Sequence, residues 1–325
     1  MQSIAFFNNK GGVGKTTLLC NVAAYFAQHL GQSVCVIDAD PQCNATQYFF
    51  DEDYVLRLFE QDGSFTISSV LDPLSSGEGY SENIQVHKAE RFGVDVIVGD
   101  PRLALTEDLL AKDWGDAKAG ELRGIRTSLV FSELLSRLQE YDYVFFDVSP
   151  SLGAINRSIL LSADYFVSPM SIDIFSLRAF ENISKWIDDW WTDWTRGIDN
   201  VRQKDKIPNL NYGQARFLGY VTQQYLAKKD ATGQRRAVQA YENIRLKIDS
   251  VIDEYKMGTA LQGLSYEIGT VPNLFSLIPM SQSNHTPVFG LLASDGVVGA
   301  HFSKVREAKE IFGEVATGIL QRATK

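Results

Sequence analysis

The sequence predicts an α/β protein in which a mostly parallel, twisted sheet is flanked by helices. Residues 3–8 form a short apolar run, and after a glycine-rich turn residues 17–30 space their apolar side chains three and four positions apart. Residues 33–38 (SVCVID) are again apolar and rich in β-branched side chains. This order predicts a strand, a loop, a helix and a strand buried on both faces, and two strands joined by a helix pair in parallel.

The same alternation continues along the chain. We expect further strands at residues 94–98, 143–147, 165–169, 216–222 and 267–271, and helices at residues 126–140, 176–194, 234–256 and 303–321. Residues 44–125 are less regular and contain Ser, Gly and Asp clusters such as SSGEGYSEN, so a partly helical insertion is expected there. No clear domain boundary is visible in the sequence, and a single domain over residues 1–325 is expected.

The composition is that of an ordinary globular protein. With 325 residues, 45% of them hydrophobic, the chain is large enough for one α/β core. The N-terminus lacks the pattern of a secretion signal, and no window is long and apolar enough to cross a bilayer, so a cytoplasmic location is expected. The three cysteines form no CxxC pair and the four histidines lack ligand spacing, which speaks against disulfides and a zinc site.

The charge argues against a surface that is basic throughout. The net charge is −9 and the isoelectric point is near 5.0, unlike the values of a protein that coats nucleic acid. Residues 220–250 nevertheless carry six basic against three acidic side chains. The candidate contacts to DNA in this segment are Lys228, Lys229, Arg235 and Arg236. A solvated helix face is the alternative interpretation of the same charges.

A row of tryptophans marks the helix predicted at residues 176–194. Trp186, Trp190 and Trp194 recur every fourth residue, and aspartates occupy the other side of the helix. Since residues four positions apart share one face of a helix, the spacing favours packing against the core over a ligand site.

The turn after the first strand has the composition of a phosphate-binding loop. Residues 9–16 read NKGGVGKT and lie between a strand and a helix, which is the context that such loops need. Glycines let backbone N–H groups surround phosphate oxygens, and the helix N-terminus adds positive potential. Lys15 is expected to reach the β and γ phosphates, and the Thr16 hydroxyl to contact Mg²⁺. The candidate nucleotide-binding residues here are Lys10, Gly11, Gly12, Val13, Gly14, Lys15, Thr16 and Thr17.

The loop departs from the ordinary GxxxxGK[ST] pattern in an informative way. Asn9 replaces the first glycine, and a second lysine, Lys10, follows it. KGGVGKT resembles the deviant Walker A motif of the ParA and MinD family. The resemblance implies a slow, partner-stimulated ATPase that uses ATP and Mg²⁺, forms a homodimer with ATP and meets an activating partner protein. It also implies that Lys10 acts in trans on the other subunit's nucleotide, where a cation stabilises the transferred phosphoryl group as an arginine finger does.

Carboxylates follow the second strand in the segment DADPQCN. Because the carboxyl ends of parallel strands border the ligand crevice, these acids are expected to face it. The segment resembles the DxDPQGN segment of ParA proteins, which implies that Asp40 orients or activates the attacking water and that Asp38 supports the Mg²⁺ shell. Gln42 and Asn44 would belong to a switch that senses the γ phosphate. Cys43 stands where the family usually has glycine, which puts the backbone geometry of this switch in question.

A second acidic strand end completes the predicted magnesium site. Residues 143–147 (YVFFD) are apolar up to Asp147, the arrangement that holds Mg²⁺ through water in P-loop ATPases. Residues 148–153 resemble the second switch of ParA proteins, although Ser149 replaces a proline that is common there. The resemblance implies the metal ligands Thr16, Asp38, Asp40 and Asp147 and the catalytic residues Lys10, Lys15 and Asp40.

The adenine site is predicted from the resemblance to ParA proteins at two strand ends. Thr222 and Gln223 follow the strand RFLGYV, where related proteins contact adenine with a polar side chain. Pro272 ends the next predicted strand and could flank the base equally well. We therefore expect Thr222, Gln223 and Pro272 near the base.

Four functions use a site of this kind. A partition or positioning ATPase, whose ATP-bound dimer binds DNA nonspecifically, fits the motifs. A membrane-cycling ATPase resembling MinD would need an amphipathic anchor, and the C-terminal sequence IFGEVATGILQRATK has few bulky apolar and basic residues, so no stable membrane anchor is expected. A third class is an enzyme that uses the same loop for metabolic or redox chemistry, either an iron-protein reductase or a ligase of the dethiobiotin class, and of these the reductase is excluded because no cysteine follows Cys43. A subunit of an antiphage or conjugation system, with residues 44–140 and the tryptophan helix contacting a partner, stays open.

Overall fold

The computed structural model describes residues 1–61, 63–208, 210, 212–225, 228–229, 235–236, 239–255, 257, 261 and 263–324. For residues 224–225, 228–229, 235–236 and 239–242 it describes the backbone alone.

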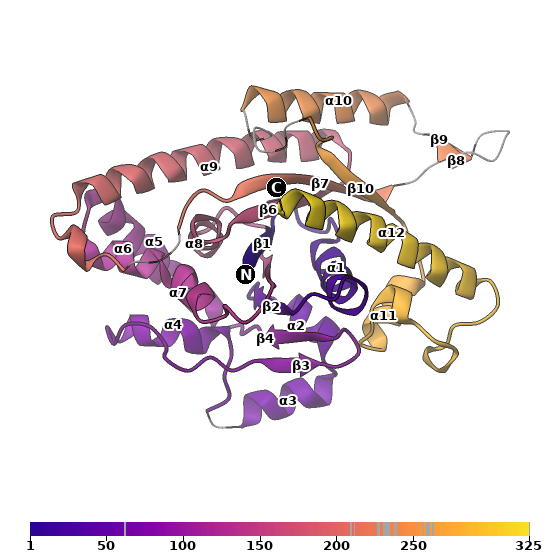
Figure 1. Ribbon diagram of the computed structural model, residues 1–325, viewed down its shortest axis with the longest axis horizontal. Coiled ribbons are helices and arrows are strands. Elements are labelled where there is room, and N and C mark those ends of the chain that lie inside the picture. The colour runs from indigo at the N-terminus through magenta and orange to yellow at the C-terminus, as the bar shows by residue number, and fades with distance from the viewer. Residues whose placement is uncertain are drawn as a thin grey trace.

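An eight-stranded sheet forms the centre of the protein (Figure 1). Its strands follow the order β10-β7-β6-β1-β5-β2-β4-β3, and every neighbouring pair is parallel except β3 with β4. The strands are β1 (Gln2–Phe6), β2 (Val34–Ala39), β3 (His87–Ala89), β4 (Val94–Ile97), β5 (Tyr143–Val148), β6 (Tyr165–Met170), β7 (Arg216–Tyr225) and β10 (Glu267–Pro272). A separate antiparallel ribbon pairs β8 (Lys228–Lys229) with β9 (Arg235–Arg236). The predicted α/β fold with a mostly parallel sheet is confirmed.

Helices cover both faces of this sheet. The helices are α1 (Lys15–His29), α2 (Asn44–Phe49), α3 (Glu52–Glu60), α4 (Ile67–Ser75), α5 (Leu103–Ala119), α6 (Leu122–Ser128), α7 (Val130–Ser136), α8 (Ala154–Ser162), α9 (Ile174–Asn200), α10 (Gln239–Glu254), α11 (Leu277–Ser283) and α12 (His301–Ala323), with 3-10 turns η1 (Lys204–Lys206), η3 (Val288–Gly290) and η4 (Ala293–Asp295). One apolar cluster joins the sheet to α1, α2, α11 and α12, and a second joins it to α4 through α10. Figure 1 shows α12 along one side of the sheet and α9 along the other.

Alternating side chains of each central strand enter these two clusters. In β1, Ile4 and Phe6 pack with α1, whereas Ala5 packs on the opposite side. Every residue of β2, β5 and β6 is buried, as expected for parallel strands covered on both faces. The apolar side of α12 also packs against the sheet, because Val305, Phe312 and Ile319 are buried in the cluster that contains α1.

One predicted helix is wrong in the structure. Residues 126–140 do not form a single helix, because α6 ends at Ser128 and α7 begins at Val130 and ends at Ser136. Leu129 between them has ψ 9°, outside the helical range, and the Ser128 carbonyl accepts a hydrogen bond from the Ser158 hydroxyl of α8 instead. The helix α5 and the three-residue strand β3 lie in the segment expected to be a partly helical insertion.

Within the part of the chain that the structure describes, no helix is both long and apolar enough to cross a bilayer.

Candidate nucleotide site

The predicted phosphate loop joins the end of β1 to the start of α1. Gly14 has a φ of 78° at the N-cap of α1, a left-handed conformation that glycine adopts without steric cost. Since glycine has no side chain to cap the helix, the first N–H groups of α1 stay available to an anion. Lys15 begins the helix and its side chain is only 9% exposed. The loop therefore has the geometry of a phosphate cradle.

A pocket of about 470 Å³ opens over this loop. Its lining contains the sequence-predicted residues Gly12, Val13, Gly14, Lys15, Thr16, Thr17, Asp40, Gln42 and Asn44. Pro150, from the segment that resembles the second switch, also lines the pocket. Three further lining residues were not singled out from the sequence: Gln47 and Tyr48 of α2, and Gln282 of α11. Gln47 and Tyr48 follow the DADPQCN segment by one helical turn, which is a usable signal. No such signal in the sequence points to Gln282, because it is far along the chain from the other lining residues.

The structure brings the two predicted acidic strand ends together. Asp38 of β2 and Asp147 of β5 are direct partners in the parallel register, and both are fully buried. Asp147 accepts a hydrogen bond of 2.8 Å from the Thr16 hydroxyl. Asp38 accepts two from Thr46 of α2, at 2.8 Å from its amide and 2.7 Å from its hydroxyl. These bonds join the start of α1, β5, β2 and α2 around one acidic centre.

Burial and neighbouring carboxylates raise the pKa of both Asp38 and Asp147. Burial and the charge of Asp147 raise the pKa of Asp38 to about 7, against the opposing hydrogen bonds from Thr46. Burial likewise raises the pKa of Asp147 to about 6, although the Lys15 charge and the Thr16 hydroxyl lower it. Since a cation would relieve this repulsion, the site favours binding one.

The donor set fits a magnesium ion that is shared with phosphate. Asp147 Oδ1 is buried and finds no hydrogen-bond partner among the described residues, so one carboxylate oxygen is free to face a cation or its water. Among those same residues, no group of three or more His, Cys, Asp or Glu side chains is placed to hold a metal by itself. Mg²⁺ characteristically takes one or two carboxylates and completes its shell with water and phosphate. Asp38 is less available, because Thr46 donates to its Oδ2 and the Asp40 amide donates to its Oδ1.

The segment after β2 holds Asp40 at the pocket in a strained turn. Asp40 is 3% exposed, lines the pocket and accepts a 3.0 Å hydrogen bond from the Gln42 amide. Cys43, which replaces the family's glycine, has a φ of 53° and so keeps the left-handed conformation that favours glycine. Its buried thiol packs in the core, which offsets part of the strain. The switch backbone thus retains a glycine-like geometry despite the substitution.

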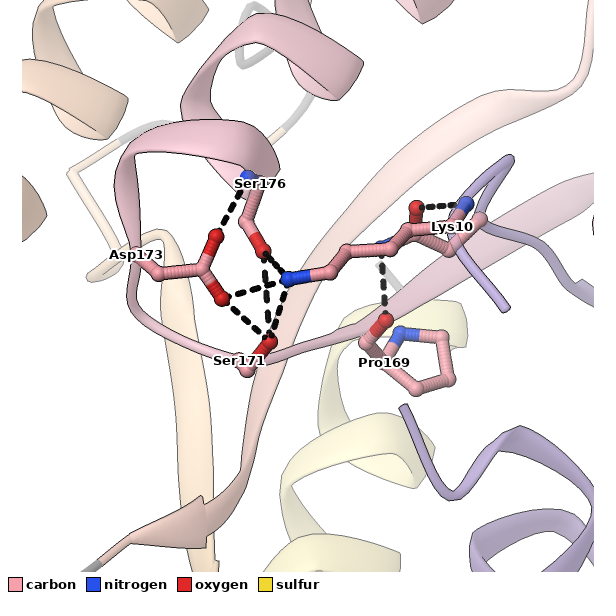
Figure 2. Close-up of polar contacts among 6 residues, drawn as sticks. Lys10, Pro169, Ser171, Asp173 and Ser176 are labelled. Atoms are coloured by element: carbon pink, nitrogen blue, oxygen red, sulfur yellow. Dashed lines mark hydrogen bonds and ion pairs between the residues drawn. The ribbon is translucent and has the colours of Figure 1, made fainter. Parts of the chain in front are cut away.

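Lys10 is held by the start of α9 within the same chain (Figure 2). Its ammonium group lies 2.5 Å from Asp173 Oδ2, 3.1 Å from Ser171 Oγ and 3.3 Å from Ser176 Oγ. Asp173 also caps α9, because its Oδ1 accepts a 2.8 Å hydrogen bond from the Ser176 amide. Burial would raise the pKa of Asp173, but the hydrogen bonds from Lys10, Ser176 and Ser171 outweigh it and lower the pKa to about 2.

Asn8 fastens the loop to the same neighbourhood. Its side-chain amide donates a 2.7 Å hydrogen bond to the Pro169 carbonyl at the end of β6, and its Oδ1 accepts 2.9 Å from the Lys10 amide. In Figure 2, Lys10 extends from the loop past Pro169 towards the first turn of α9. Phosphate loop, β6 and α9 are therefore one connected unit.

The three residues expected near adenine lie outside the pocket lining. The Thr222 hydroxyl donates a 2.8 Å hydrogen bond to Glu267, which occupies it within the sheet. Gln223 lies beside the loop, since its Oε1 would be 3.2 Å from a Cβ atom built on Gly14, and its buried Nε2 has no partner among the described residues. Pro272 ends β10 and pairs with Tyr225. Of the three, Gln223 is the one placed against the nucleotide loop.

The four candidate DNA contacts lie on the β8–β9 ribbon. Lys228 pairs with Arg236 and Lys229 pairs with Arg235 in antiparallel register. Figure 1 draws this ribbon away from the main sheet. This pairing places four basic residues on one short two-stranded ribbon.

Comparison with known proteins identifies the family. A family model described as an AAA domain matches residues 1–196. The chromosome-partitioning ATPase Soj of Thermus thermophilus is 33% identical over 178 residues, which are 55% of this chain and 58% of Soj. Protein IncC of Escherichia coli is 29% identical over 238 residues, 73% of this chain and 53% of IncC. The chain belongs to the ParA family. It matches a little over half the length of these two relatives.

A solved structure extends the likeness of this ParA-family chain beyond residue 196. The crystal structure of protein DIP2308 from Corynebacterium diphtheriae has 33% sequence identity and a TM-score of 0.72, and the match covers 88% of this chain and 97% of that one. In this ParA-family chain the phosphate loop and Asp40 line one pocket, whereas Asp38 and Asp147 are fully buried and lie outside its lining.

Proposed function

We propose that this ParA-family protein is a slow ATP-hydrolysing switch whose ATP-bound form is a sandwich homodimer that partitions DNA or positions another cargo. The observation that carries this proposal is the presence of two lysines on one loop: Lys15 faces the pocket, while Lys10 leaves it and reaches a surface helix. One lysine suffices to bind a nucleotide. The second one has a purpose if it serves the nucleotide of another subunit.

Each residue at the pocket has a distinct task in this proposal. The N–H groups of the loop and Lys15 bind the phosphates, and Asp40 accepts the proton of the attacking water. Thr16 and Asp147 would hold Mg²⁺, which would neutralise phosphate charge, and Asp38 would support the site through its hydrogen bonds with Thr46. Gln223 would contact the base, and Thr222 and Pro272 would lie near it on the adjoining strands β7 and β10.

Dimerisation requires Lys10 to exchange its partner. In the single chain, the Lys10 ammonium is paired with Asp173, and the Lys10 side chain is 29% exposed. To act in trans it must leave this carboxylate for the more highly charged phosphates of the other subunit. Because a triphosphate attracts a cation more strongly than a single carboxylate does, nucleotide in the partner subunit favours the exchange. The same step frees Asp173 at the start of α9.

A DNA cargo is supported by the basic ribbon and by the packing of α12. Four positive residues on β8 and β9 are enough for nonspecific contacts to phosphates, even on a chain with a net charge of −9. The apolar face of α12 packs against the core and is not free to enter a membrane. These two observations favour a nucleic acid over a lipid surface, and an activating partner protein is proposed as in the rest of the family.

Sizing with ATP and Mg²⁺ tests the switch. Asp40→Ala should bind ATP and accumulate as a dimer, because the water is no longer activated, whereas the wild type cycles back to monomer. Asp199→Ala, which changes an exposed aspartate in the last turn of α9, is the matched control and should behave as wild type. A monomeric Asp40→Ala protein that still binds ATP would contradict the proposed dimer.

DNA binding is tested by charge neutralisation. Changing Lys228, Lys229, Arg235 and Arg236 to Gln should abolish ATP-dependent, salt-sensitive binding to random duplex DNA. The control changes four exposed basic residues elsewhere to Gln: Arg202, Lys204, Lys206 and Arg306. Equal losses in both variants would assign binding to overall charge and remove the ribbon from the proposal.

A further inference from the structure

All five tryptophans of the chain gather on two helices. One is Trp114 of α5, and the other four lie on α9 at Trp186, Trp190, Trp191 and Trp194. Trp114 stacks on Trp194 with ring centroids 6.2 Å apart and planes 6° apart, and Trp186 meets Trp190 edge-on at 5.8 Å. The expectation of core packing holds for Trp190 and Trp194, which are 4% and 1% exposed, but Trp186 is 44% exposed.

An open groove of about 530 Å³ lies beside these rings. Trp114, Trp186 and Trp190 form its apolar walls, and side chains of α5, α8 and α9 supply its charges. It is separate from the nucleotide pocket, because the two share no lining residue. Its volume suits a few side chains of a peptide.

The groove contains a cation whose hydrogen-bonding capacity is unused. The guanidinium of Arg157, on α8, lies 4.3 Å from the ring centroid of Trp114 and 5.9 Å from that of Trp190. Among the residues that the structure describes, the guanidinium group of Arg157 has no hydrogen-bond acceptor and no ion-pair partner. A guanidinium has five N–H donors, and none of the Arg157 nitrogens is among the buried atoms without a partner, so an acceptor on a ligand can reach them from solvent.

Arg157 nevertheless keeps its charge at neutral pH. Burial lowers the pKa of Arg157 to about 10, and the more distant carboxylates of Glu107 and Asp193 partly oppose this. The guanidinium is therefore a cation that lies beside two tryptophan rings and has no oxygen acceptor among the described residues. Stacking on tryptophan orients the guanidinium plane and leaves its edge for a planar acceptor.

The surrounding charges favour an acidic ligand. Lys118 and Arg196 share a single acid, since both lie 3.6 Å from Asp193. With Arg157 the lining carries three cations against two carboxylates, Asp189 and Asp193. A ligand that brings a carboxylate would balance the charge and pair with the Arg157 fork through two parallel hydrogen bonds.

We propose that this groove binds an acidic peptide segment of a partner protein, with one carboxylate on Arg157 and a neighbouring apolar side chain on the tryptophan walls. Both halves of the ligand follow from the lining: the unpaired guanidinium selects a carboxylate, and the exposed face of Trp186 selects an apolar group beside it.

The groove is connected to the nucleotide site through α8. This helix begins at Ala154, directly after the segment that contributes Pro150 to the nucleotide pocket. The amides of Ala154 and Ile155 donate to Glu107 of α5, the helix that also carries Trp114. A partner peptide bound to Arg157 would therefore contact α8, the helix that directly follows the segment resembling the second switch, and could shift its position. This last step rests on the proposed function, whereas binding itself does not.

Intrinsic fluorescence tests the binding directly, because every tryptophan lies on the two helices of the groove. The probe is the peptide acetyl-Gly-Glu-Leu-Glu-Leu-Gly-amide, titrated without nucleotide, and its matched control has Gln in place of both Glu residues. We expect a saturable change in emission with the acidic peptide that weakens as salt is added, and none with the Gln peptide. No change up to about 5 mM, or an equal response to both peptides, would overturn the proposal.

Substitutions then locate the carboxylate. Arg157→Gln should weaken binding about 10-fold or more, because a charged hydrogen-bonded pair is lost, and Arg157→Lys should fall between. Arg178→Gln, an exposed residue of α9 outside the lining, is the control and should bind as wild type. If Arg157→Gln does not fold, Lys118→Gln with Arg196→Gln replaces it and should weaken binding as well. Unchanged affinity in a folded Arg157 variant means that the arginine only supports the rings, which overturns the proposal.

Since these titrations contain no ATP, a protein that failed to dimerise could still bind the peptide. The two proposals therefore fail separately.

Discussion

The pocket over the phosphate loop and the tryptophan groove have similar volumes, about 470 and 530 Å³, but they are assembled from different kinds of groups. Most of the pocket lining comes from two short stretches of the sequence, within residues 12–17 and 40–48, to which Pro150 and Gln282 are added. The groove is built by side chains of α5, α8 and α9, which are far apart in the sequence. The first kind of site is encoded as a motif, and the second exists only when the helices have packed.

The largest expected effect is the loss of ATP binding at the pocket, with no change at the groove. Lys15→Gln should reduce ATP affinity about 100-fold or more, since a buried cation that pairs with phosphate is lost, and calorimetry measures it. Peptide binding at the groove should be unchanged. Lys185→Gln, an exposed position on α9, is the matched control. Loss of both activities in Lys15→Gln would mean that the two sites are not independent.

The next effect tests how closely the backbone packs at the acidic centre. A Cβ atom on Gly99 would lie 2.9 Å from both Asp38 Oδ2 and Cys43 Sγ. Gly99→Ala should therefore lower the free energy of unfolding by about 2 kcal/mol, measured by urea denaturation.

The helix of the groove provides the control for that substitution. Gly115 lies within α5, and a Cβ atom there meets nothing within 4 Å. Gly115→Ala should raise the free energy of unfolding by up to about 1 kcal/mol. Equal destabilisation by both substitutions would show that close packing is not specific to the acidic centre.

A smaller effect concerns the joint between the two regions, at the start of α9. Asp173→Asn removes the charge that holds Lys10 but keeps an N-cap side chain, so α9 should stay intact. With Lys10 released, the ATP-bound dimer should form at a several-fold lower protein concentration, which sedimentation measures. Weaker dimerisation would assign Asp173 to the dimer interface instead.

The smallest effect is a dependence of stability on pH. The pKa of Asp173 is lowered to about 2, below the usual value of about 3.9 for an aspartate in an unfolded chain. Its contribution to stability is therefore complete above about pH 4 and is lost as the pH falls towards 2. Since Asp173 is partly exposed, the contribution is modest. The difference in unfolding free energy between wild type and Asp173→Asn should shrink over this range, and a constant difference would contradict it.

Local patterns predicted the fold and most of the candidate site. The parallel sheet, the loop before α1 and the meeting of Asp38 with Asp147 follow from strand ends and from the order of the elements. What could not be predicted depends on distant partners. Asp173 meets Lys10 across 163 positions, and Gln282 joins the pocket from α11. Likewise, the predicted helix is interrupted at Leu129, where the Ser128 carbonyl accepts a hydrogen bond from Ser158 of α8. The spacing of apolar residues within one segment cannot predict a contact with another helix.

The buried thiol groups make it practical to follow the proposed association of two subunits with fluorescent labels. All three cysteines, Cys20, Cys35 and Cys43, are buried, and burial raises the pKa of each thiol, so little reactive thiolate exists in the folded protein. A single cysteine introduced at an exposed position of α9 should accordingly react with a maleimide dye while the native thiols do not. Fluorophores attached this way would report distances between subunits during the ATP cycle without any need for a cysteine-free background.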